Sequence, residues 1–183
     1  MFKPLNILDE KHKVLRRHSE EVKLPLSKED KDTINQIITH LKYSQIEKLA
    51  EKYDLRPGMG LAFPQLGKLK RIIVIVHEYE EGKFKNYVIV NPKIISHSEE
   101  KIALETGEGC LSVNREIEGH VPRYARITIT GYDPDGEKIT IRAREDLSVA
   151  FQHEVDHLDG ILFFDKIDKN KPFFTENDDV RLI

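Results

Sequence analysis

Hydrophobic positions follow a helical period in the first third of the chain. Apolar residues recur at the i, i+3, i+4 and i+7 spacing of one helical face: Ile34, Ile37, Ile38 and Leu41. Ser27 lies just before this stripe and Asp30 follows three residues later, which resembles a capping box. The pattern predicts a helix over residues 28–43. A second sequence that resembles a capping box begins at Ser44 and precedes another apolar helical face over residues 46–53. This face is rotated by roughly 120° from the first, which predicts a break in the helix near Ser44.

The period changes after residue 58, where short runs of β-branched residues replace the helical stripes. The runs at residues 72–76 and 87–90 are bounded by Gly, Asn and Pro, and they predict buried strands. Residues 126–132 and 138–142 flank the sequence Asp-Pro-Asp-Gly, in which Pro and Gly favour a tight turn. This arrangement predicts an antiparallel hairpin.

A further helix is predicted from Asp146, as N-cap, to Asp159, and Gly160 suits the left-handed position that ends it. The chain has no internal repeat, low-complexity tract or Pro/Gly/Ser linker. We therefore expect residues 1–183 to form a single domain of the α+β class.

Composition excludes several classes of protein. Of the 183 residues, 39% are hydrophobic and 33% are charged, which is typical of neither a disordered nor a membrane-embedded chain. The net charge of −3 argues against nucleic acid as the main partner. The first residues mix charges of both signs, and no stretch approaches about 18 apolar residues, so we expect a cytoplasmic protein. The one cysteine, Cys110, excludes an internal disulfide.

Candidate chemistry is concentrated in the sequence His153-Glu154-Val155-Asp156-His157, which is an H-E-x-x-H motif. Residues i and i+4 of a helix project side by side, so both imidazoles can reach one metal ion while Glu154 lies beside it as an acid or base. The alternative is a helix with two surface or core histidines. The intervening glutamate and the clear helix ends favour a catalytic metal site.

A catalytic metal needs a third protein ligand. One metalloprotease pattern requires a histidine where this chain has Phe163, so that pattern fails. A second metalloprotease pattern uses a downstream glutamate as its third metal ligand, and Glu176 is a candidate for this role. We favour Cys110, because the glycines beside it allow close backbone approach and a metal would keep its thiolate deprotonated. A buried inert thiol is the alternative.

Three segments together resemble peptide deformylases. They match the family patterns G-x-G-x-A-A-x-Q, E-G-C-L-S and Q-H-E-x-D-H, in the family's order, at residues 58–65, 108–112 and 152–157. One position departs from the family patterns: Phe63 stands where the first pattern has its second alanine. The bulk of this ring puts the local packing and the pocket shape in doubt. The length and early helices resemble the longer type found in Gram-positive bacteria and their wall-less relatives.

The resemblance implies antiparallel or mixed β-sheets packed around a central metal-binding helix, with additional N-terminal helices. It implies an enzyme that hydrolyses the N-formyl group from the first methionine of new polypeptides and releases formate. By resemblance, Cys110, His153 and His157 bind one divalent ion, Fe²⁺ in the cell, with Zn²⁺, Ni²⁺ or Co²⁺ able to replace it in a preparation. Glu154 would transfer protons, while the Gln65 amide and the Leu111 N–H would stabilise the oxyanion.

The methionine side chain needs an apolar slot. Val149 and Ala150 lie on the helical face of His153, although ordinary core packing would select the same residue types. By family analogy, Gly60 contacts the extended substrate. We expect a bacterial, cytoplasmic monomer that meets nascent N-formylmethionyl peptides at the ribosome exit, without nucleic-acid specificity or membrane contact. The rival hypotheses are a zinc peptidase that uses Glu176 and a domain with a structural His/His/Cys metal site.

Overall fold

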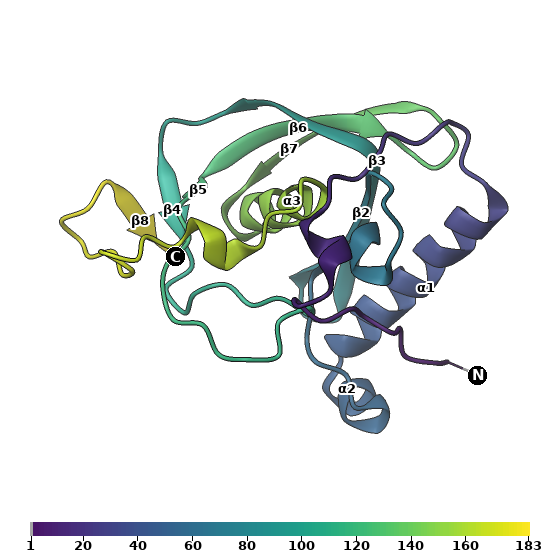
Figure 1. Cartoon of the computed structure of the whole chain (residues 1–183), viewed down its shortest axis with the longest axis horizontal. Helices are drawn as coiled ribbons and strands as arrows, with labels where there is room; N and C mark the ends of the chain where they lie inside the picture. Colours follow the sequence, from purple (N-terminus) through teal and green to yellow (C-terminus); the bar gives the residue numbers. More distant parts are fainter. Residues whose placement is uncertain (1) are drawn as a thin grey trace.

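The structure is a computed structural model and describes residues 2–183. Two β-sheets surround one central helix (Figure 1). The larger sheet is antiparallel, with strand order β1-β2-β3-β6-β7. Its strands are β1 (Gly60–Ala62), β2 (Ile72–Glu80), β3 (Lys83–His97), β6 (Arg126–Tyr132) and β7 (Lys138–Arg144). The smaller, mixed sheet has the order β5-β4-β8, formed by β4 (Lys101–Ala103), β5 (Arg123–Tyr124) and β8 (Val180–Leu182). The α+β class is confirmed.

Within residues 2–183, three α-helices accompany the sheets: α1 (Lys28–Ser44), α2 (Glu47–Tyr53) and α3 (Glu145–Leu158). Short 3₁₀ turns are η1 (Lys13–Arg16), η2 (Phe63–Leu66) and η3 (Phe163–Lys166). Figure 1 shows α3 enclosed by the curve of the larger sheet and α1 on the outside of β2. Within the described residues, none of the helices combines the length and apolar character needed to cross a bilayer.

The first helix begins as its sequence predicts. The Ser27 side chain accepts a hydrogen bond from the Asp30 backbone N–H and caps α1. The break near Ser44 is also confirmed, but the second capping box is wrong, because α2 has Ile46 as its N-cap. Ser44 instead donates to the Leu41 carbonyl and accepts a bond from the Gly58 N–H. It therefore joins the end of α1 to the segment before β1.

Strand β2 is buried from both sides, which explains its nearly continuous run of Ile and Val. Ile72, Val74 and Val76 pack with α1, whereas Ile73 and Ile75 pack with α3. The strands predicted at residues 72–76 and 87–90 and the hairpin of β6 and β7 are all found. In the turn of that hairpin, the Asp133 carboxylate accepts bonds from the backbone N–H groups of residues 135 and 137.

Helix α3 carries the H-E-x-x-H motif into the interior. It ends as predicted, with Gly160 at φ +73°, a conformation that favours glycine. A side chain there would also lie 2.7 Å from the Arg16 backbone. The predicted N-cap is wrong, since α3 begins at Glu145 after Arg144, and Asp146 lies in the first turn. The Asp146 carboxylate accepts a bond from the N–H of Leu147 and lies 3.3 Å from His77 Nε2.

Two isoleucines of β3 allow the stability of this core to be tested. Ile89 is fully buried in the cluster with α3, whereas Ile95 on the same strand is 54% exposed. We expect Ile89→Ala to lower the free energy of unfolding by about 2–5 kcal/mol, because it leaves a cavity. Ile95→Ala should change it by less than about 0.5 kcal/mol. Urea denaturation measures both, and equal losses would contradict the packing described above.

Candidate metal centre and active site

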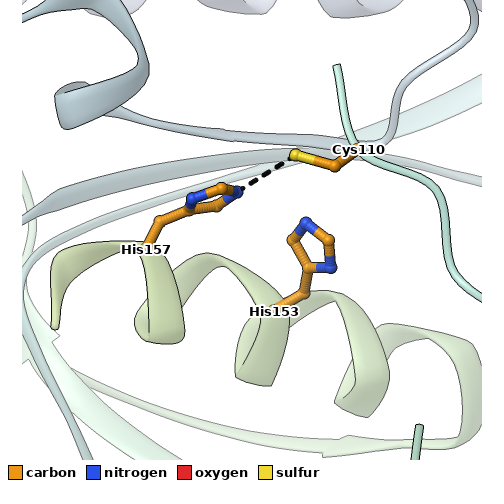
Figure 2. Close-up of side chains that lie close together, drawn as sticks. All are labelled: Cys110, His153 and His157. Carbon is orange, nitrogen blue, oxygen red and sulfur yellow. Dashed lines mark hydrogen bonds between the residues drawn. The ribbon is translucent and has the colours of Figure 1, made fainter. Parts of the chain in front are cut away.

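Cys110, His153 and His157 converge although the cysteine is far from the histidines in sequence. The histidines lie one turn apart on α3, and Cys110 reaches them from the loop between β4 and β5 (Figure 2). Each residue offers one ligand atom, and these three atoms lie within 4.8 Å of one another. Cys110 Sγ is 3.3 Å from His157 Nε2. All three side chains are almost fully buried.

A buried carboxylate orients His153. Glu108 Oε2 lies 2.7 Å from His153 Nδ1, so the other ring nitrogen, Nε2, is directed towards the ligand cluster. Arg123 from β5 donates two bonds to Glu108, at 2.7 and 3.0 Å, and a third to Asp156 at 2.6 Å. Carboxylates that accept a bond from a ligating histidine fix its tautomer and ring orientation.

The charges of this network shift several pKa values. Burial raises the pKa of Glu108, but the bonds from His153 and Arg123 outweigh this effect and lower it to about 2. Burial likewise lowers the pKa of His153, yet bonds to Cys110 and Glu108 hold it well above its usual value. Burial, followed by the positive charge on His153, holds the pKa of His157 well below the usual value. The two shifts favour a positive charge on His153 and a neutral His157.

Glu154 lies beside these ligands with a carboxylate that is not fully hydrogen-bonded. It is buried, and among the described residues its Oε2 has no hydrogen-bond partner. Burial raises the pKa of Glu154 to about 7. Glu154 also lies against Gly60, where an added Cβ would be 2.5 Å from Glu154 Oε1. A side chain at residue 60 would therefore displace the Glu154 carboxylate from its place against β1.

Gln65 is held in one orientation beside Cys110. Its side-chain oxygen accepts a bond from the Ala62 N–H at 2.8 Å. Its amide nitrogen donates to Ser112 Oγ at 3.1 Å and lies 3.7 Å from Cys110 Sγ. The side chain is 1% exposed. Because the oxygen is already bonded, the donor end of the amide is fixed towards the ligand cluster.

A cavity of about 280 Å³ opens onto these groups. Its lining includes every candidate site residue except His157, namely Gly60, Gln65, Cys110, Leu111, Val149, Ala150, His153 and Glu154. His157 lies behind them, 1% exposed. Val149 and Ala150 form part of the apolar wall, as expected from their helical spacing. The cavity is thus built from β1, the Cys110 loop and α3.

Three residues considered in the sequence lie outside this cavity. Phe63 is fully buried in the cluster that packs against α1, so its bulk does not enter the cavity. Phe163 stacks on the His153 ring, with centroids 5.9 Å apart. Glu176 is exposed and lines a separate surface pocket with Glu100 and Lys101. The structure therefore does not bring Glu176 together with the two histidines.

The donor set fits a divalent transition metal. One thiolate and two imidazoles suit zinc and iron, and three protein ligands leave a position for water or substrate. His157 Nδ1 is buried without a partner in the described part of the chain. A cation would also supply the positive charge that this cluster stabilises when metal is absent. The residues present therefore fit a metal ion.

Three residues that organise the site, Glu108, Arg123 and Arg56, were not identified from the sequence. Glu108 and Arg123 form a buried ion pair, with side chains 3% and 2% exposed. The signal for Glu108 was its place in the E-G-C-L-S segment, two residues before Cys110. Arg123 carries no local signal, since it reaches Glu108 and Asp156 only through the fold. Arg56 was also missed, and it donates to the backbone carbonyls of Cys110 and Val113.

A helix that presents two histidines and a buried carboxylate beside a cysteine defines the class of metal-dependent hydrolases. Residues 4–173 match the family model described as polypeptide deformylase. "Peptide deformylase 2" of Geobacillus stearothermophilus is 48% identical over 92% of this chain and 91% of its own. "Peptide deformylase 2" of Bacillus subtilis is 49% identical over the same shares. A plant peptide deformylase structure superimposes with a TM-score of 0.76 at 29% identity, covering 93% and 84% of the two chains.

The chain therefore belongs to the peptide deformylase family, whose members are metal-dependent hydrolases that remove the N-formyl group from nascent peptides. The resemblance noted in the three sequence segments is confirmed, as is the likeness to the enzymes of Gram-positive bacteria.

The Glu108–Arg123 pair yields a stability prediction. In metal-stripped protein, Glu108→Gln should lower the free energy of unfolding by about 3 kcal/mol or more, because it leaves the buried Arg123 charge less compensated. Glu105→Gln is the matched control, an exposed carboxylate in the same loop, and should cost less than about 0.5 kcal/mol. Urea denaturation of both variants measures the difference. Equal stability of the two variants would mean that the buried pair does not hold the loop.

Proposed function

We propose that Cys110, His153 and His157 bind one divalent metal ion, and that this ion is Fe²⁺ in the cell. Zn²⁺, Ni²⁺ or Co²⁺ would occupy the same ligands in a preparation, since affinity at such sites rises from iron towards zinc. The observation that carries the proposal is the meeting of three ligand atoms within 4.8 Å at the floor of a cavity that also holds Glu154. When bound, the ion would act as a Lewis acid and lower the pKa of water at neutral pH.

Glu154 is proposed as the general base and acid. Its partly unpaired, buried carboxylate can accept the proton of the attacking water and later deliver it to the departing methionine amine. A group that both accepts and returns a proton works best with a pKa near the working pH, and burial moves the Glu154 pKa in that direction. Gly60 supports this role, because the absence of a side chain lets the carboxylate lie against β1.

The Gln65 amide and the Leu111 backbone N–H are proposed to stabilise the negative charge that develops on the formyl oxygen. The Gln65 orientation is fixed before substrate binds, which is the condition for effective electrostatic stabilisation. The loss of one such donor typically costs about 100-fold or more in rate. The products are formate and a peptide with a free methionine amine.

Val149 and Ala150 are proposed to form the wall of the methionine slot, and Gly60 to contact the extended peptide. Val149 and Ala150 both line the cavity, and both lie on the turn of α3 that precedes His153. The segment of β1 has only β2 as a neighbour in the sheet, so its other edge can pair with an extended substrate.

We further propose that residues 1–183 work as one catalytic domain and a monomer in the bacterial cytoplasm. The substrates would be N-formylmethionyl chains as they leave the ribosome. The enzyme would recognise the peptide and would have no nucleic-acid specificity. The family's activity on nascent peptides supports this setting.

The two rival hypotheses receive less support. A peptidase that uses Glu176 as third ligand would need this exposed residue at the histidines, and it lines another pocket. A purely structural metal site would have no need of a cavity or of an unpaired acid beside the ligands.

Removal of the proposed base tests the mechanism. Glu154→Ala should keep the fold and its bound metal, because Glu154 is not assigned as a ligand, and should lower kcat on formyl-methionyl peptides by about 10²–10⁴-fold. Circular dichroism, metal content and formate release measure the three properties. Glu118→Ala, an exposed acid in the loop after Cys110, is the control and should leave all three unchanged. Near-normal turnover of Glu154→Ala would refute the assignment.

The metal proposal predicts sensitivity to oxygen. Iron-loaded enzyme should lose activity in air through oxidation of the ion or of Cys110, while zinc-loaded enzyme should lack this sensitivity. Cys110→Ser should lose metal and turnover in both forms. Activity is followed with and without oxygen, alongside metal content. If Cys110→Ser retains full metal and activity, Cys110 is not the third ligand and Glu176 must be tested.

A further inference from the structure

One charged side chain of the active-site cavity has no part in the proposed mechanism. Asp146 lines the cavity at the start of α3, and its side chain is 57% exposed. Asp146, Val149, Ala150 and His153 follow the i, i+3, i+4 and i+7 spacing, so they lie on one face of α3. This face therefore presents a candidate metal ligand, then the two proposed methionine contacts, and then a carboxylate about 10 Å along the helix axis from His153.

The strands show in which direction the cavity leaves the candidate metal centre. Gly60 of β1 lies against Glu154 of α3. Antiparallel pairing of β1 with β2 places the later residues of β2 beside the chain that precedes Gly60. One of these, His77, lies 3.3 Å from Asp146, so the start of α3 is beside the same stretch of chain. Because residues 57–59 also line the cavity, it extends from Glu154 towards Asp146.

The Asp146 carboxylate is available to a ligand. Its polar contacts within the described residues are the Leu147 N–H and the ring of His77, which is charged only when protonated. No lysine or arginine of residues 2–183 forms an ion pair with Asp146. Lys85 is opposite His77 in the strand register, but its ammonium group lies over the Tyr87 ring. A cationic group from outside the chain can therefore approach the carboxylate.

The other charges of the cavity are held differently. Arg56 donates to two backbone carbonyls and to Asn114, so its guanidinium is fixed against the loop between β4 and β5. Glu108 and Glu154 also line the cavity, but both are buried. Asp146 is therefore the exposed acid of the lining, and it stands on the α3 wall.

We propose that Asp146 is a specificity-determining residue that favours lysine or arginine as the third residue of the peptide. This inference rests on the proposed function, in which the methionine side chain lies against Val149 and Ala150 and the peptide extends along β1. Side chains alternate in an extended chain, so the first and third residues project to the same side, about 7 Å apart. Asp146 lies about one helical turn, or about 5 Å, beyond the methionine contacts. A basic third side chain therefore reaches Asp146, whereas the second points away.

The test compares amidated peptides that differ only in their third residue. Formyl-Met-Ala-Lys and formyl-Met-Ala-Glu are hydrolysed by the metal-loaded wild-type enzyme, and formate release is measured. We expect kcat/KM to be about three- to tenfold higher for the lysine peptide, as for an exposed ion pair. The difference should lie in KM, because a contact far from the reacting bond is the same in substrate and transition state. Added salt should reduce the preference.

Two substitutions of Asp146 isolate its charge. Asp146→Asn keeps the size of the side chain and an acceptor for the Leu147 N–H, and it should reduce the preference to less than about twofold. Asp146→Lys should reverse the preference in favour of glutamate. The charge-matched control is Glu81→Gln, which removes a negative charge from an exposed residue of the turn between β2 and β3 and should keep the wild-type preference. The ratio of two substrates on one enzyme is insensitive to a general loss of activity.

The outcomes separate this inference from the proposed function. If the wild type releases formate equally from both peptides, or if Asp146→Asn keeps the full preference, the role of Asp146 is wrong while deformylation stands. A preference found instead between formyl-Met-Lys-Ala and formyl-Met-Glu-Ala overturns the assignment to the third residue. Absence of formate release from every peptide overturns the proposed function and this inference with it.

Discussion

The buried contact of Glu108 with His153 and Arg123 is the interaction on which the site depends. It joins the loop that carries Cys110, the strand β5 that carries Arg123, and the helix α3 that carries both histidines. Arg123 also bonds Asp156, inside the H-E-x-x-H motif. A charge so deeply buried is tolerated only when it is fully paired, so the three segments must come together correctly or not at all. The geometry of the ligands follows from this requirement.

Close packing around glycine imposes a second constraint. Gly58 and Gly60 lie against Leu111 and Glu154, where an added Cβ would be 2.7 and 2.5 Å from the nearest side-chain atom. The Gln45 side chain donates to the Gly58 and Val76 carbonyls, so the end of α1 holds the strand that borders the cavity. The N-terminal helices therefore contribute to the active site although none of their residues lines the cavity.

Sequence reasoning succeeded where the signal was local. The helix beginning at Lys28, the hairpin of β6 and β7 and the end of α3 at Gly160 each depend on a period or a turn within a few residues. The capping roles predicted for Ser44 and Asp146 failed because each side chain found another partner: Ser44 bonds Gly58, and Asp146 bonds its neighbour's N–H. The β5-β4-β8 sheet was missed, since its strands have two or three residues and show no period.

The same distinction between local and long-range information applies to charge. A net charge of −3 argued against a nucleic-acid partner, yet a net value is a sum over all faces of the molecule. The end of β2 and the turn after it carry Glu78, Glu80 and Glu81, whereas Arg126, Arg142 and Arg144 lie on the neighbouring strands β6 and β7. At about 0.15 M salt, fields decay over about 8 Å, so a partner at one face of the molecule senses mainly the charges of that face. The distribution of charge over the strands decides which partners can bind there.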